Sequence, residues 1–228
     1  MATENKLRLL NLAVGALSDG EVYVEIGCYK GASLIGASAG NPAAKIYACD
    51  NFSQFRATAD ELRATLARRT APGQVSFHDM EFRDFLRLRP WHPASIGVYF
   101  YDGGHSFADQ YEALALVLGS LANDALVIID DTNKRNVRAA NRLFARCVPG
   151  FELVLDLRTA RNHSPAWWNG IQLYRFRRSG PPLPLDGPAY RCRRFLWDDV
   201  LLRGRHLYRA GRGALKQRLK ARARPRAR

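Results

Sequence analysis

The fold is decided by the segment Val22–Ser33, VYVEIGCYKGAS. Its first five residues are apolar apart from Glu25 and predict a buried strand, which Gly27 follows directly. A glycine at this point permits a tight turn and lets a ligand approach the backbone, and Gly31 lets the next helix begin close to the sheet. We expect Glu25, Gly27, Gly31 and Ser33 to line a cofactor site. An ordinary strand–helix turn is the alternative interpretation.

Strands and helices are predicted to alternate along most of the chain. Six apolar runs after the first predict strands, namely Lys45–Cys49, Val75–His78, Ile96–Tyr101, Ala125–Ile129, Phe151–Leu157 and Ile171–Phe176. Helical patterns occupy residues 1–17, Ala32–Ala39, Phe55–Arg69, Phe107–Leu121 and Asn136–Cys147, with a brief turn or helix at Glu81–Arg87. Such alternation predicts a parallel sheet with helices on both faces.

The last two predicted strands break this pattern. The short segment between Leu157 and Ile171 contains Pro165, two tryptophans and Gly170 rather than a helical repeat. A parallel crossover needs about a dozen residues or more and usually a helix, so a hairpin with an antiparallel last strand is favoured. The fold class is therefore α/β, a Rossmann-like doubly wound sheet of five parallel strands with a terminal antiparallel hairpin. This is the layout of class I methyltransferases, which use S-adenosylmethionine (SAM).

Charge divides the chain into a neutral body and a basic end. Residues 1–174 carry 18 Lys and Arg against 18 Asp and Glu, whereas residues 175–228 carry 17 against 3, so the net charge of +14 lies in the last quarter. We expect a methyltransferase domain at 1–178, a Pro/Gly-rich linker at 179–194 and a basic amphipathic tail at 195–228. The tail suits an anionic membrane surface or nucleic acid, with a solvated appendage as the alternative.

Two acidic residues after the second and third predicted strands are candidates for binding the nucleoside. Asp50 ends the second strand, where its carboxylate can accept hydrogen bonds from both ribose hydroxyls, or can cap the following segment instead. Asp79 is placed to reach an adenine amino group, with a solvated loop acid as the alternative. The ribose partner is common to SAM and NAD sites. Tyr29, which stands where a dinucleotide fingerprint needs glycine, disfavours NAD.

Carboxylates also follow the fourth and fifth predicted strands, at Asp102 and at Asp130 with Asp131. These strand ends line the ligand crevice of an open α/β sheet, and three converging carboxylates need a cation or a shared proton. Oxygen ligands favour Mg²⁺, with Mn²⁺ or Ca²⁺ as alternatives. His105 is a candidate general base, although it can equally cap a helix or hold Asp102. The remaining alternative is that the three acids only cap helices and turns.

Together these motifs resemble a known family. Glu-x-Gly-x-x-x-Gly at 25–31, Asp50, Asp-Gly-Gly-His-Ser at 102–106 and Ile-Asp-Asp at 129–131 are similar to the small bacterial methyltransferases of the macrocin and sugar O-methyltransferase group. The resemblance covers roughly residues 20–176. It implies that Asp102, Asp130 and Asp131 bind Mg²⁺ beside the acceptor hydroxyls. The family usually has an acid at position 104, a tyrosine at position 105 and a longer N-terminal lid, where this chain has Gly104, His105 and a short N-terminus.

The expected function is therefore SAM-dependent methylation of a hydroxyl on a sugar or small secondary metabolite. His105 or a carboxylate such as Asp102 would take the hydroxyl proton. The alternatives are a nucleotide-binding Rossmann protein of another class, and a methyltransferase acting on RNA or a glycolipid through its tail. Scattered cysteines and the lack of a signal peptide or long apolar run favour a cytoplasmic protein, peripheral at the inner membrane face if the tail binds lipid. A homo-oligomer is compatible with the sequence.

Overall fold

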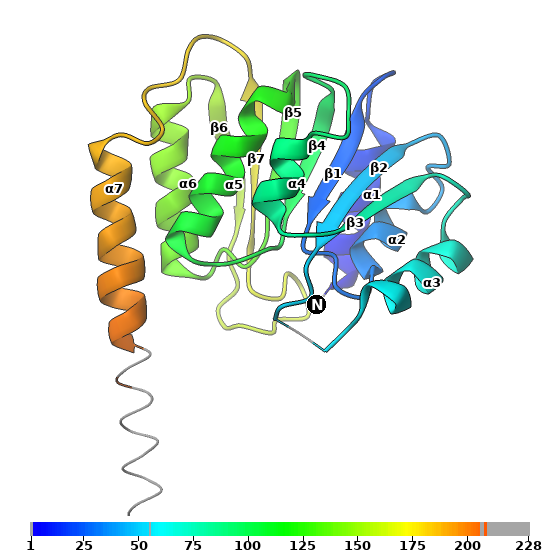
Figure 1. Cartoon of the computed structure of the whole chain (residues 1–228), viewed down its shortest axis with the longest axis horizontal. Coiled ribbons are helices and arrows are strands. Elements are labelled where there is room, and N and C mark those ends of the chain that lie inside the picture. The colour runs from blue at the N-terminus through cyan, green and yellow to red at the C-terminus, as the bar shows by residue number, and fades with distance from the viewer. Residues whose placement is uncertain (1, 55, 206–207, 209–228) are drawn as a thin grey trace, which may run out of the picture.

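A single seven-stranded sheet organises the chain, with strand order β3-β2-β1-β4-β5-β7-β6 (Figure 1). The computed structural model describes residues 2–54, 56–205 and 208. The strands are β1 Val22–Ile26, β2 Lys45–Asp50, β3 Val75–Asp79, β4 Ile96–Tyr101, β5 Leu121–Ile129, β6 Phe151–Leu157 and β7 Ile171–Arg177. β1 to β5 pair in parallel, as the strand–helix alternation predicts.

Helices cover both faces of this sheet (Figure 1). They are α1 Glu4–Gly15, α2 Ala32–Ser38, α3 Ala59–Arg69, α4 Phe82–Leu88, α5 Phe107–Val117, α6 Arg135–Cys147 and α7 Pro188–Arg194, with a short 3₁₀ turn η1 Leu118–Ser120. One core cluster joins the sheet to α4, α5 and α6, and a second joins it to α1, α2 and α3. In β1, Val24 faces the first cluster and Tyr23 the second, because successive strand side chains point to opposite faces.

The terminal hairpin is confirmed. β7 runs antiparallel to both β5 and β6, and the segment between β6 and β7 contains a tight turn instead of a crossover helix. The α5–β5 boundary differs from the prediction of a helix over Phe107–Leu121. The helix ends at Val117, η1 follows, and β5 already begins at Leu121. Apolar residues on both sides of the Gly119-Ser120 break look alike in sequence, so periodicity alone misplaced the boundary.

The stretch predicted as a linker over 179–194 includes a helix. α7 begins at Pro188, a residue suited to a first helical turn, and continues as the π-helical segment η2, Phe195–Leu202. Tyr190 stacks on Tyr111 of α5 at a ring-centroid distance of 4.6 Å, so this segment packs on the domain. The aromatic contact is tertiary, and the local Pro/Gly composition gives no sign of it.

The structure describes only the beginning of the basic tail that the sequence predicts from residue 195. η2 accounts for its beginning, whereas residues 206–207 and 209–228 lie outside the described part of the chain, together with the predictions that fall on them. Within the described residues, no helix combines the length and the apolar character needed to cross a bilayer.

Candidate functional site

A cleft of about 700 Å³ opens at the carboxyl ends of the parallel strands. Its lining includes five residues singled out from the sequence, which are Gly27, Asp50, Asp102, His105 and Asp131. The crevice outside the strand ends is where open α/β sheets bind their ligands. Five other candidates, Glu25, Gly31, Ser33, Asp79 and Asp130, are not part of this lining.

Gly27 lets β1 approach the end of β4. Its φ is +85°, and a Cβ at this position would lie 2.3 Å from the backbone oxygen of Asp102. Gly31 is also left-handed, with φ +82°, and stands at the start of α2, where a Cβ would meet Leu62 of α3 at 2.7 Å. Both glycines are therefore required by the backbone, and Gly27 allows the turn after β1 to lie directly against the backbone of Asp102.

Asp50 is held by backbone amides at the mouth of the cleft. The amide of Tyr29 donates to Oδ2 at 2.7 Å, and the amide of Phe52 donates to Oδ1 at 2.8 Å. These bonds tie the end of β2 to the turn after β1 and fix the orientation of the carboxylate. Each oxygen retains a further lone pair that can accept a ligand hydroxyl.

Glu25 lies beneath the turn after β1 and is fully buried. Tyr23 donates to its Oε2 at 2.6 Å, and the Ser33 hydroxyl donates to Oε1. Burial raises the pKa of Glu25 to about 7, against the opposing effect of these hydrogen bonds. Ser33 thus holds Glu25 and does not itself face the cleft. Asp79 is exposed, and its neighbours Met80 and Glu81 line the cleft instead.

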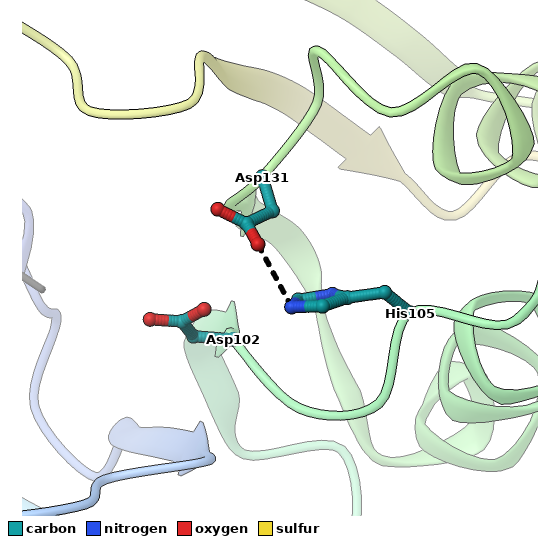
Figure 2. Close-up of side chains that lie close together, drawn as sticks. All are labelled: Asp102, His105 and Asp131. Carbon is teal, nitrogen blue, oxygen red and sulfur yellow. Dashed lines mark ion pairs between the residues drawn. The ribbon is translucent and has the colours of Figure 1, made fainter. Parts of the chain in front are cut away.

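At the centre of the cleft, three side chains from two strand ends converge (Figure 2). Asp102 and His105 come from the loop after β4, and Asp131 follows β5. His105 Nε2 lies 2.9 Å from Asp131 Oδ2. Burial would raise the pKa of Asp131, but the hydrogen bond from His105 and the charges of His105 and Lys134 hold it well below the usual range. Burial and the nearby Asp130 raise the pKa of Asp102 well above its usual value.

Asp130 lies next to Asp102 but outside the cleft lining, and it pairs with Lys6 of α1. Both side chains are 1% exposed. Burial alone would lower the pKa of Lys6, but the charges of Asp130 and Asp102 outweigh it and raise the pKa. A buried lysine therefore balances part of the negative charge that the sequence assigned to a metal ion. The sequence pattern that could have predicted the burial of Lys6 is helical spacing, because Lys6 occupies the same helix face as the buried Leu10, Ala13 and Val14.

The loop between β6 and β7 forms a wall of the cleft. Asn169 donates to Asp131 Oδ1 at 2.8 Å, and its own backbone oxygen accepts from the Asn133 amide at 2.7 Å. His163 and Trp168 also line the cleft and are 4.7 Å apart between ring centroids. None of these residues was singled out from the sequence. The Trp-Trp-Asn-Gly motif at 167–170 is the available signal in the sequence, but its composition does not indicate that it lines a site.

Three side chains of the cleft offer ligand atoms for the predicted metal ion. Asp102, His105 and Asp131 each offer one ligand atom, and these atoms lie within 4.8 Å of one another. They fit a divalent cation, with His105 in the place that the sequence gave to Asp130. Lys134 Nζ also contacts Asp131 Oδ2 at 2.6 Å, so Asp131 is already charge-paired in this structure.

Comparison with known proteins gives the class. Residues 24–132 match the family model described as "Methyltransferase domain". Together with the sheet order and the cleft, this match identifies the chain as a class I SAM-dependent methyltransferase. The matched segment runs from β1 to the acids after β5 and therefore includes Asp50, Asp102 and Asp131. No curated protein matches the sequence.

Several solved structures share the fold at low identity. An O-methyltransferase from Bacillus cereus in complex with SAH is 16% identical, with a TM-score of 0.60, over 76% of this chain and 82% of that one. TomG from Streptomyces achromogenes, an O-methyltransferase of tomaymycin synthesis in complex with SAM, is 17% identical with a TM-score of 0.61, over 78% and 82%. A methyltransferase from Geobacter sulfurreducens is 18% identical with a TM-score of 0.57, over 78% and 81%.

Proposed function

We propose that this enzyme transfers the methyl group of SAM to a hydroxyl oxygen of a small-molecule acceptor, a sugar or a secondary metabolite. The observation that carries the proposal is the His105–Asp131 pair, which lies beside Asp102 in the same cleft as Asp50. Similarity of fold to O-methyltransferases that hold SAM or SAH supports it. The cofactor would occupy the Gly27 and Asp50 side, and the acceptor would meet His105.

In the proposed step, an oxygen–carbon bond forms as the carbon–sulfur bond of SAM breaks, and S-adenosylhomocysteine leaves. The hydroxyl proton passes to Nδ1 of His105, the ring nitrogen without a partner among the described residues, while the Nε2–H group faces Asp131 Oδ2, which stabilises the imidazolium charge. Lys134 and Asn169 hold Asp131 in place from its other sides. Alignment of the acceptor oxygen with the methyl group supplies most of the remaining acceleration.

Asp102, His105 and Asp131 would hold a divalent ion if the enzyme uses one. Such an ion would bind the acceptor oxygen and lower the pKa of its hydroxyl. In its absence Lys6 and Lys134 provide the positive charge next to these acids.

The test is a transfer assay with methyl-labelled SAM and a panel of sugars, polyols and phenols, with Mg²⁺ and with EDTA. We expect His105→Gln to lower the turnover number about 10²- to 10⁴-fold while its affinity for S-adenosylhomocysteine stays unchanged. Full activity of this variant would contradict the assignment of the base. Full wild-type activity in EDTA would exclude a catalytic role for a metal ion, and base catalysis by His105 would remain the proposal.

A further inference from the structure

A second cavity, of about 550 Å³, lies beside the beginning of α6 and the β6–β7 loop. Five arginines line it, which we call the arginine pocket: Arg135, Arg138, Arg142, Arg158 and Arg161. Asn133, Asn162 and the indole of Trp197 from η2 complete much of the wall. Its lining contains no residue that the sequence analysis assigned to the site.

The positive charge of this pocket is only partly balanced. Arg138 Nη1 donates to Asp156 Oδ1 at 2.6 Å, and Arg158 Nε lies 3.8 Å from Asp156 Oδ2. Among the residues that the structure describes, Asp156 is the one carboxylate that forms ion pairs with the pocket arginines. Five arginines therefore line one cavity, and within the described part of the chain a single carboxylate pairs with two of them.

Arg138, one of the lining residues, also has an unsatisfied donor. The residue is 8% exposed, and its Nε is buried without a hydrogen-bond partner among the described residues. A buried donor left unpaired is destabilising, and groups of the described residues do not fully satisfy the guanidinium of this lining arginine.

The start of α6 points to the same class of ligand. The helix begins at Arg135 directly after Lys134, with no side-chain cap and no acid in its first turn. The amino end of a helix carries a partial positive charge and exposes backbone N–H groups, so cations there are unfavourable and anions are stabilised. This helix of 13 residues therefore gathers cations at the end where they are least favourable.

We propose that the arginine pocket binds a phosphoryl group, and that this group belongs to the methyl acceptor. Arginine is suited to phosphate because its planar fork donates two parallel hydrogen bonds. The β6–β7 loop connects the two sites: Arg158–Asn162 line the arginine pocket, and His163, Trp168 and Asn169 line the catalytic cleft. The link to the acceptor rests on the proposed function, whereas phosphoryl binding stands independently of it.

Phosphoryl binding is tested by calorimetry with pyrophosphate as the probe. We expect the double variant Arg135→Gln/Arg161→Gln to bind pyrophosphate at least about tenfold more weakly than the wild type. Both residues are exposed, so the fold should be retained. Arg146→Gln, on the same helix but outside the pocket lining, is the matched control and should bind as the wild type does. No binding by the wild type, or equal binding by the double variant, would overturn the proposal.

A parallel titration with S-adenosylhomocysteine separates the two proposals. If pyrophosphate binds and S-adenosylhomocysteine does not, the proposed function fails and the phosphoryl site stands. Glucose 1-phosphate and vesicles containing phosphatidic acid then distinguish a water-soluble acceptor from a lipid headgroup. Binding of either one supports the link to the acceptor, and binding of neither overturns it.

Discussion

Among single residues, Lys6 changes the interpretation of the site most. Its ammonium group is buried against Asp130 and close to Asp102. A metal ion is therefore not the only cation that can balance the negative charge of the acids after β4 and β5. The pair also connects the first helix to the fifth strand. Burying two charges is costly, and removing one partner leaves the other uncompensated.

We therefore expect Lys6→Met to lower the free energy of unfolding by about 3–5 kcal/mol, because Asp130 would remain buried without its partner. The double variant Lys6→Met/Asp130→Asn should lose much less than the sum of the two single variants. Urea unfolding of the four proteins measures this coupling. Additive losses would show that the two side chains do not stabilise each other.

Glu25 provides a pH-dependent prediction. Its pKa is about 7 in the folded protein, above that of an unfolded chain, so the folded state binds the proton more tightly. The free energy of unfolding should therefore fall as the pH rises from about 4.5 to about 7, by about 3 kcal/mol in total. Below that pH window Glu25 is protonated in both states and this loss of unfolding free energy is absent. Above the window the loss is complete.

Glu25→Gln should remove this decrease, because glutamine keeps the shape of the side chain and does not titrate. The measurement is the difference in unfolding free energy between the two proteins at each pH. Parallel profiles across the window would mean that Glu25 titrates normally in the fold.

At the residue scale, the sequence predicted which carboxylates lie in the cleft better than it predicted which side chains pair with them. Asp50, Asp102 and Asp131 lie in the cleft because a carboxylate after a parallel strand must reach the carboxyl edge of the sheet. The pairing of Asp130 with Lys6 spans 124 positions, and no local pattern encodes such a contact. Asp131 and Asp130 are adjacent in sequence, yet the chain turns between them, with φ +56° at Asp131.

Among the elements, the α7–η2 segment departs furthest from expectation. Asp198 of η2 accepts hydrogen bonds from the amides of Phe107 at 2.7 Å and Ala108 at 2.9 Å. It therefore caps α5, whose Ser106 side chain satisfies only the amide of Asp109. A segment beyond the catalytic domain predicted from sequence thus supports the helix that follows His105.

Asp198→Ala should lower the free energy of unfolding by about 1 kcal/mol, because two amides at the start of α5 lose their acceptor. It should also speed hydrogen exchange across Pro188–Leu202, where a contact to the domain is lost. Exchange monitored by mass spectrometry gives both effects. Asp199→Ala is the matched control, since Asp199 pairs only with Arg203 of the same helical segment among the described residues. Equal exchange in both variants would contradict the capping role.

The strands and their parallel or antiparallel direction could be predicted from the sequence, because alternation of apolar runs with helical repeats restricts the topology. The absence of a helical repeat before Ile171 was enough to predict the antiparallel end. Helix α7 could not be predicted in the same way. Its composition is typical of a linker, and the aromatic contact between Tyr190 and Tyr111 exists only in the folded chain.

For the molecule as a whole, cofactor binding should be visible as thermal stabilisation. Ligands that bind only the folded state stabilise it by about 2.7 kcal/mol at a hundredfold excess over Kd. For a chain of this size that corresponds to a rise in Tm of roughly 5–10 °C with SAM or S-adenosylhomocysteine. NAD at the same concentration should leave Tm unchanged. A larger shift with NAD than with SAM in thermal melting would contradict the class assignment.

The contact between Lys6 and Asp130 also bears on the order in which the chain folds. A ribosome releases α1 before β5, and until β5 has formed Lys6 lacks the carboxylate of Asp130 against which it is buried. Helix α1 can pack against α2 early, through the hydrogen bond from the Asn11 side chain to the Gly36 carbonyl. Its amino-terminal turn, which contains Lys6, can reach its final position only after β5 has formed. A chain stalled before β5 would therefore hold the glycine turn after β1 without Asp131.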